Sequence, residues 1–372
     1  MVKVVVAPDK FRGSLSAPEV AAAVERGVLR VYPDTNVVKI PVADGGEGTV
    51  EAALAAGWRE VRVAATGAVG QPVHAAYAVK DDTALIEQAQ ICGLATLADD
   101  ERDAMAASTY GLGSVIGHAL DRGIARLVLA IGGSASTDGG AGMLQALGVK
   151  LSDARGHDLP TGGAALNRLV DADVTRLHPR VDRVEVIVTC DVDNPLLGPQ
   201  GAAAVFGPQK GASAVDVEML DAGLSRLSGV LAPGRQELAA MPGAGAAGGT
   251  AYGALALLGA RLEPGIALVL DMVQFAQAAA GAHLVITGEG SIDEQSLRGK
   301  VPVGAARVAA AQGVPVVVVA GRSLLSADRL TPVGISAVYP LSDVEPDPAI
   351  SMAKAALLLE EMSAQLAREQ LP

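Results

Sequence analysis

The chain has 372 residues and a mass of 37.4 kDa; half of its residues are hydrophobic but only 2% are aromatic, so Ala, Val, Leu and Ile must form the core. This length exceeds what one hydrophobic core usually serves and predicts two domains. A formal net charge of −12 with no basic patch argues against a nucleic-acid partner. No apolar run reaches the ~18 residues of a membrane span, and no signal peptide is evident, so we expect a cytoplasmic protein.

The chain begins with alternating strands and helices joined by polar loops. Val2–Ala7 is a β-branched run typical of a strand buried on both faces of a parallel sheet. A helix to about Val31 follows, and Ser16 with Glu19 forms a capping-box pattern at its start. A strand over Asn36–Val42 and a helix from Thr49 repeat the arrangement.

From residue 59 to about 96, short alternating runs predict an antiparallel or mixed sheet. A helix over 109–122 then leads to a strand, Leu127–Ile131, and a short helix near Met143–Leu147. Patterns further along the chain predict strands at 184–189, 283–287, 314–320 and 336–339, and helices at 215–230, 248–258, 266–280, 302–312 and 348–368.

The contrast between the strand–helix alternation and the short alternating runs predicts two α/β domains. Each would be formed from separate segments of the chain. The first would comprise residues 1–58, 105–140 and 281–372, and the second residues 59–104 and 141–280. Ligands of open parallel sheets bind outside the carboxyl ends of the strands. The loops at those ends should therefore converge; they carry Asp9-Lys10, Asp44, Ser134 with Asp138, and Glu289 with Asp293.

The stretch Gly132–Gly142 follows a buried strand and precedes a helix. Free backbone N–H groups at such a helix start would make a seat for a phosphate or a carboxylate. The alternative is a tight turn that binds nothing. Asp138 is either the cap of this helix or a metal ligand.

Carboxylates beside glycine loops suit a site for Mg²⁺ and a polyphosphate, because Mg²⁺ takes one or two carboxylates together with substrate phosphates. Five basic residues would supply positive charge from the same kind of loop: Lys10, Arg12, Lys210, Arg298 and Lys300. Helix capping remains the alternative role for Asp9 and Asp44.

Asp191 and Asp193 follow the strand predicted at 184–189. They would point to one side if that strand continued through them, which favours a shared site. The alternative is an Asx turn imposed by Pro195.

Several common binding and catalytic motifs are absent or match only weakly. The chain has no G-x-x-x-x-G-K-[ST] motif, and Gly243–Gly248 matches G-x-G-x-x-G but does not follow a strand. The histidines lie outside the glycine loops, which argues against a His-based hydrolase or a zinc site. Cys92 and Cys190 have no metal-ligand spacing and are interpreted as structural thiols.

Taken together, the motifs resemble those of the type I bacterial glycerate kinases, in order along nearly the whole chain. They are Ala7–Ser16, Asp44–Thr49, Gly132–Gly140, Cys190–Leu196, Phe206–Ala212, Gly245–Gly249, Thr287–Asp293 and Gly299-Lys300. Two positions depart from the family pattern: Arg12 replaces a usual Lys, and Ser136-Thr137 replaces a frequent Thr-Asn.

The resemblance implies ATP- and Mg²⁺-dependent phosphorylation of D-glycerate, with 2-phospho-D-glycerate favoured over the 3-phospho product. It also implies a Rossmann-like parallel-sheet domain, a second inserted α/β domain, and an active site in the cleft between them. A kinase of another small hydroxy acid or polyol, or a non-catalytic binder of an anionic metabolite, remains as an alternative. We expect no nucleic-acid or membrane partner, and we consider a homodimer as the assembly.

Each residue of the expected site receives a role. Asp191 would be the base or orienting carboxylate, and Lys10 would stabilise the transferring phosphoryl group. The remaining residues would bind phosphate or nucleotide (Gly132, Gly133, Ser134, Lys210, Lys300), substrate (Arg12, Asp44, Asp193) or Mg²⁺ (Glu289, Asp293).

Overall fold

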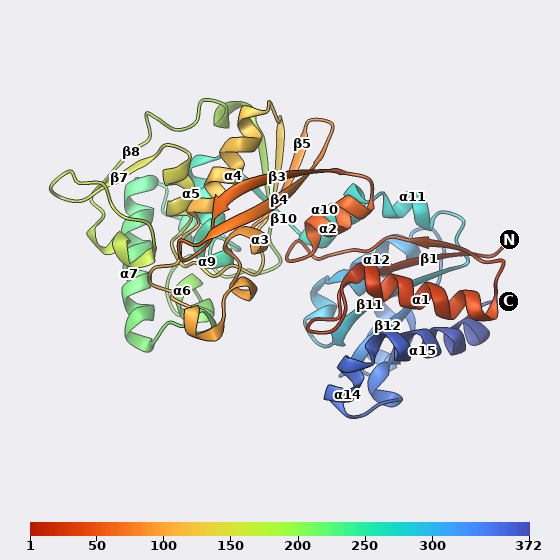
Figure 1. Cartoon of the computed structure of the whole chain (residues 1–372). Coiled ribbons are helices and arrows are strands. Elements are labelled where there is room, and N and C mark those ends of the chain that lie inside the picture. Colours follow the sequence, from red (N-terminus) through yellow and green to blue (C-terminus); the bar gives the residue numbers. More distant parts are fainter. The chain divides into compact units, whose positions relative to one another are not determined.

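The computed structural model describes residues 1–372, apart from the side chain of Arg298. The chain divides into two compact units. The first comprises Met1–Asp44, Glu51–Gly57 and Gly265–Pro372, so the two ends of the chain, red and blue in Figure 1, belong to one unit. The second comprises Gly45–Val50 and Trp58–Pro264.

The first unit is built on a five-stranded sheet in which every neighbouring pair is parallel, in the order β13-β12-β11-β1-β2. The strands are β1 (Lys3–Pro8), β2 (Asn36–Lys39), β11 (Leu284–Ile292), β12 (Val316–Ser323) and β13 (Ile335–Pro340). The helices are α1 (Ala17–Val31), α10 (Gly265–Met272), α11 (Phe275–Ala279), α12 (Val301–Ala310), α13 (Ala327–Leu330), α14 (Pro348–Ala353) and α15 (Ala355–Gln370). Helix α2 (Thr49–Ala55) begins in the second unit and ends in the first.

Helices cover both faces of this sheet, as the unbroken apolar runs of its strands require. In β1, Val4 and Val6 join the core cluster of α1 and α15, whereas Val5 and Ala7 join that of α10, α11 and α12. The start of α1 follows the predicted capping box, since the backbone N–H of Ser16 donates to Glu19 at 2.8 Å.

The second unit contains a six-stranded sheet in the order β10-β9-β6-β5-β4-β3. Its strands are β3 (Arg59–Thr66), β4 (Pro72–Lys80), β5 (Thr83–Glu87), β6 (Arg126–Ala130), β9 (Glu185–Thr189) and β10 (Arg261–Glu263), and a separate two-stranded sheet pairs β7 (Lys150–Ser152) with β8 (Asp171–Asp173). The helices are α3 (Ala89–Cys92), α4 (Tyr110–Asp121), α5 (Ala141–Ala146), α6 (Ala202–Phe206), α7 (Ala214–Leu231), α8 (Glu237–Ala240) and α9 (Ala246–Leu257). The β3-β4-β5 portion is antiparallel and the rest of the six-stranded sheet is parallel, as predicted for residues 59–96.

The predicted boundaries need three corrections. Residues 45–50 and Trp58, expected in the first domain, belong to the second unit. Residues 105–140 belong to the second unit, because β6 pairs with β5 and β9 instead of extending the sheet of β1. Residues 265–280 belong to the first unit, where Ile266 and Phe275 lie in the core cluster of α12. An apolar parallel strand fits either sheet, so its composition does not identify its neighbours.

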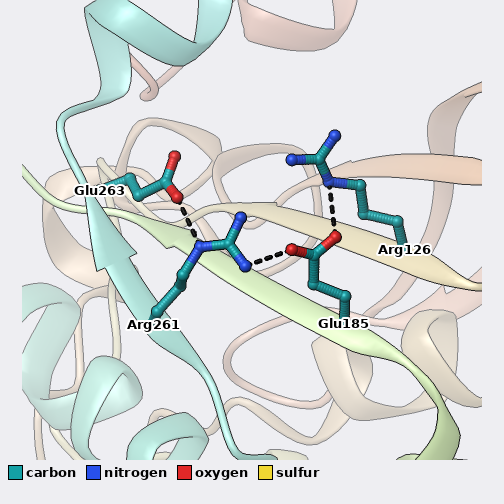
Figure 2. A network of polar contacts seen from close by, with 4 residues as sticks. All are labelled: Arg126, Glu185, Arg261 and Glu263. Carbon is teal, nitrogen blue, oxygen red and sulfur yellow. Dashed lines mark hydrogen bonds and ion pairs between the residues drawn. The ribbon is translucent and has the colours of Figure 1, made fainter.

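A chain of ion pairs crosses the parallel strands β6, β9 and β10 at the edge of the second sheet (Figure 2). Glu185 lies between Arg126, at 3.0 Å from Nε, and Arg261, and the Nε of Arg261 also contacts Glu263 at 2.5 Å. These side chains are one-third to one-half exposed, so the network contributes only a small stabilisation to the pairing of the short edge strand β10.

Within the described residues, every helix is too short or too polar to span a membrane.

Candidate active site

In the first unit, three carboxylates gather at the carboxyl edge of the parallel sheet. Asp9 directly follows β1, and its backbone N–H donates to the carbonyl of Gly288 in β11 at 2.7 Å. The segment after β2 stays beside β1, since the N–H of Val42 donates to Pro8 at 2.9 Å, and this brings Asp44 to the same edge. Glu289 lies in the adjacent strand β11. The expected convergence is therefore confirmed for these loops.

The environment of Asp9 disfavours its charged form. Burial, together with the neighbouring carboxylates of Asp44 and Glu289, raises its pKa from 3.8 to about 8, against the opposing charge of Lys10. The Oδ1 atom of Asp9 accepts the backbone N–H of Lys10 at 2.7 Å, which fixes the carboxyl group at the strand end. This edge of the sheet thus brings together carboxyl groups that disfavour one another's ionisation.

Glu289 is 6% exposed and lies within β11, which runs on to Ile292 instead of ending near residue 287. Burial raises the pKa of Glu289 to about 7, while the hydroxyl of Ser296, which donates to its Oε1, and the charge of Lys300 oppose the rise. The carboxylates of Asp293 and Asp44 are close enough to contribute to this raised pKa. Glu289 is therefore close enough to feel the charges of Asp44, Asp293 and Lys300.

The two carboxylates expected to hold Mg²⁺ differ in their surroundings. Asp293 is half-buried and organises the turn after β11, where its Oδ1 accepts the backbone N–H of Gln295 at 2.8 Å. Over the described part of the chain, no group of three or more His, Cys, Asp or Glu residues is arranged to enclose a metal ion. A pair of carboxylates still fits Mg²⁺, which usually takes one or two from the protein and the rest of its ligands from phosphate and water.

The basic residues of the first unit lie in the same loops. Lys10 is half-buried beside Asp9, and its charge also acts on Glu51. Arg12 is exposed in a short loop that is closed by a bridge between Phe11 and Leu15. Arg12 is thus available to an anionic ligand from solvent.

In the second unit, the start of helix α5 after β6 differs from the expectation, because its backbone N–H groups already have partners in the protein. Asp138 is fully buried and accepts the backbone N–H groups of Gly140 at 3.2 Å and Gly142 at 3.1 Å. The first backbone N–H groups of α5 are likewise bonded within the protein: Ala141 to the carbonyl of Asp138, Met143 to the hydroxyl of Thr109, and Leu144 to Gly140. This helix start therefore does not offer free donors to a phosphate. Asp138 is its cap.

In the first half of the same loop, Gly132 and Gly133 are accessible, whereas Ser134 is 5% exposed. A Cβ atom on Gly132 would lie 2.8 Å from the Cα of Gly46, so only glycine allows this close approach of two backbones. Gly133 is exposed, and its carbonyl accepts the N–H of Leu94 at 2.8 Å. The N–H of Ala135 donates to Cys92 at 3.0 Å, so this part of the loop is tied to the segment after α3.

Lys210 lies beside this loop but is almost completely buried, at 2% exposed. Its Nζ donates to the Oγ of Ser134 at 2.9 Å and to the carbonyl of Ser136. Burial lowers the pKa of Lys210 to about 8, and the negative charge of Asp138 opposes the change.

Asp191 and Asp193 are exposed in the loop after β9. Because β9 ends at Thr189, strand alternation does not orient these two side chains. The glycines of the G-x-G-x-x-G match serve packing here: a Cβ on Gly245 would lie 2.2 Å from the carbonyl oxygen of Pro195. The Gly243–Gly248 segment therefore packs against the loop that contains Asp191 and Pro195.

The predicted site residues are thus divided between the two units. The first unit contains Lys10, Arg12, Asp44, Glu289, Asp293 and Lys300, and the second contains Gly132, Gly133, Ser134, Asp191, Asp193 and Lys210.

Two carboxylates at strand ends have surroundings that the sequence alone did not assign. Asp9 was interpreted as a helix cap or a site residue, but Ser16 and Glu19 already cap α1, which leaves Asp9 to the acidic edge. Glu87 ends the apolar strand β5 and is 1% exposed; it accepts the N–H groups of Gly48 at 3.1 Å and Val50 at 3.0 Å. Its position at a strand end, like that of Asp9, was the available signal.

Comparison with known proteins gives consistent matches over the whole length. A family model described as the glycerate kinase family matches residues 4–370. The chain is 44% identical over 342 residues to the glycerate kinase of Bacillus subtilis (strain 168) and, equally, to the glycerate 2-kinase of Escherichia coli (strain K12); each alignment covers 91% of this chain and 90% of the relative. It is also similar to a crystal structure from Salmonella typhimurium LT2 assigned as glycerate kinase 2, with a TM-score of 0.85, 40% identity, and 99% and 98% of the two chains covered.

Proposed function

The chain belongs to the glycerate kinase family, and on this premise we propose that it transfers the γ-phosphoryl group of ATP to the 2-hydroxyl of D-glycerate. It is an enzyme, a phosphotransferase with an alcohol group as acceptor. The observation that carries the proposal is the extent of the family match, which spans residues 4–370 and therefore includes every candidate site loop. The choice of the 2-hydroxyl is supported by the name of the Escherichia coli relative, glycerate 2-kinase.

Phosphoryl transfer depends mainly on positioning and on stabilising the charge that spreads over the phosphate oxygens. In the first unit, Lys10 and Lys300 are proposed to neutralise that charge, and their effect on neighbouring carboxyl groups supports this role. In the second unit, Gly132, Gly133 and Ser134 are proposed to bind the phosphates of ATP through backbone and hydroxyl donors.

Glu289 and Asp293 are proposed to hold the Mg²⁺ that accompanies ATP. A pair of carboxylates matches the usual protein share of a Mg²⁺ site whose other ligands are phosphate and water. When bound, the ion would neutralise charge on the phosphates of ATP.

The acceptor is proposed to be held by Arg12, Asp44 and Asp193. The exposed guanidinium of Arg12 suits a bidentate contact with the carboxylate of glycerate, and the two aspartates can accept its hydroxyl groups. Asp191 then takes the proton of the attacking hydroxyl as the new O–P bond forms and ADP leaves.

The decisive experiment couples ADP release to D-glycerate and identifies the phosphorylated carbon by NMR. We expect turnover with D-glycerate, little with L-glycerate, and a 2-phospho product. A 3-phospho product would contradict the regiochemistry, and preference for another hydroxy acid or polyol would contradict the substrate. Stabilisation by glycerate without any ADP release would contradict catalysis.

A cytoplasmic location is proposed because the reaction consumes ATP, and fractionation of cells tests it. The homodimer remains a prediction, and light scattering in solution would measure the oligomeric state. The net charge of −12 supports small anionic substrates, bound by a few local cations, over nucleic acid.

A further inference from the structure

Lys210 is placed unusually for a residue expected to meet phosphate. It ends a short 3-10 helix, Pro208–Lys210, and its side chain is buried at 2% exposed. Burying an ammonium group is costly unless hydrogen bonds and opposite charge compensate it, so its partners indicate its role.

Those partners are two points on the loop that follows β6. The Nζ of Lys210 donates to the Oγ of Ser134 at 2.9 Å and to the backbone carbonyl of Ser136. Between them, the N–H of Ala135 donates to the carbonyl of Cys92 at 3.0 Å. Three consecutive residues of the loop are therefore hydrogen-bonded, two to Lys210 and one to Cys92.

The charge of Lys210 is balanced within the same loop. Asp138 is fully buried and is close enough to oppose the lowering of the pKa of Lys210. The carboxylate of Asp138 is already occupied by Thr109, Gly140 and Gly142, so it fixes the second half of the loop while Lys210 fixes the first.

We propose that Lys210 is a positioning residue, which sets the conformation of Gly132–Ser136 before any ligand binds by holding Ser134 and Ser136, and that it does not itself contact the transferring phosphate. The inference rests on the proposed function only for the identity of the reaction that the loop serves. The loop would then present Gly132, Gly133 and Ser134 in a fixed geometry, which is what preorganised stabilisation of phosphate charge requires.

The test uses the full-length, ligand-free protein. Amide hydrogen exchange of peptides covering residues 131–138 is compared in the wild type, Lys210→Met, Ser134→Ala and the double variant. Lys354→Met, which removes an exposed lysine outside the site, is the matched control. Kinetic constants for ATP and D-glycerate are measured on the same proteins.

We expect Lys210→Met to speed exchange of the loop on the order of 10-fold or more without ligand, as the loss of charge-assisted hydrogen bonds implies. Ser134→Ala should reproduce part of this effect, and the double variant should add less than the sum, because both remove the same contact. The Lys354→Met protein should match the wild type. The value of kcat should fall in both site variants.

An unchanged rate of loop exchange in Lys210→Met, together with a raised KM for ATP, would overturn the proposal and make Lys210 a direct phosphate ligand. If Lys210→Met does not fold, Ser134→Ala decides alone, since it keeps the lysine but removes one of its two acceptors; wild-type exchange in that variant would also overturn the proposal. The exchange measurement contains no substrate, so a failure of the glycerate kinase proposal would leave its outcome readable.

Discussion

Asp138 accepts two hydrogen bonds from Thr109, one from the backbone N–H and one from the hydroxyl, each at 2.8 Å. The same hydroxyl accepts the N–H of Met143 at 2.9 Å, so Thr109 connects the cap to the first turn of α5. The first backbone N–H groups of α5 thereby find their hydrogen-bond acceptors within the protein. The phosphate contacts proposed for this loop therefore fall to its first half.

Asp138→Asn is expected to lower the free energy of unfolding by about 2–4 kcal/mol, because an amide cannot accept at both of its terminal atoms and one buried N–H loses its partner. Urea unfolding measures the change. Asp34→Asn, at an exposed aspartate, is the control and should leave the midpoint unchanged. Equal midpoints for the two variants would refute the capping role.

Asp191→Asn is expected to lower kcat by about 10²–10⁴-fold, the usual contribution of a general base, with the fold retained. Asp191 is exposed, so the substitution creates no buried defect. Steady-state kinetics with D-glycerate and ATP, together with circular dichroism, test this. Near-normal turnover would remove Asp191 from the role of base.

Asp9→Asn is expected to stabilise the protein at pH 9 by about 1–2 kcal/mol, because it removes a buried carboxylate placed beside Asp44 and Glu289. The pKa of Asp9 is raised from 3.8 to about 8, so the folded protein keeps a proton that the unfolded chain releases. Wild-type stability therefore falls as the pH rises from about 4 to 8, and the full penalty is present above pH 8.

Thermal melting at pH 4 and pH 9 measures this difference. The gain of Asp9→Asn over the wild type should be small at pH 4, where the folded state is protonated at this group and the unfolded chain is near half-protonated, and largest at pH 9. Asp34→Asn should show no such trend. A gain independent of pH would indicate that burial at Asp9 does not disfavour its charge.

Arg261→Met is expected to destabilise the second unit by under about 1 kcal/mol at low salt, with the difference shrinking towards ~1 M salt as screening weakens the network. Arg261 contacts both Glu185 and Glu263 (Figure 2), whereas Arg62, the matched control, pairs with Glu60 alone and is 78% exposed. Arg62→Met should cost less. Chemical unfolding at several salt concentrations gives the comparison, and an effect independent of salt would assign the loss to packing.

Local features were readable in the amino-acid sequence. The first strand and the capped helix after it follow from a β-branched run and from the spacing of Ser16 and Glu19, and both are present in the structure. The carboxylates at strand ends were also visible, although for Asp9 the sequence left helix capping open as an alternative, a role that Ser16 and Glu19 fill in the structure.

Non-local features were harder to predict. The strand Arg126–Ala130 was expected beside the terminal segments, yet it pairs with β5 and β9. The helix predicted over 266–280 is interrupted at Gln274, whose φ of 55° lies in the left-handed region.

The sequence by itself determined the order of the elements, the chemistry of the loops and the resemblance to a kinase family, because each depends on residue types at short spacing. Only the tertiary structure decided which strands are neighbours, that Asp9, Asp44 and Glu289 share one edge, and that the ammonium group of Lys210 is buried against Ser134. The physical reason is that apolar strands are interchangeable in composition, whereas burial and the pKa of a side chain depend on partners far away along the chain.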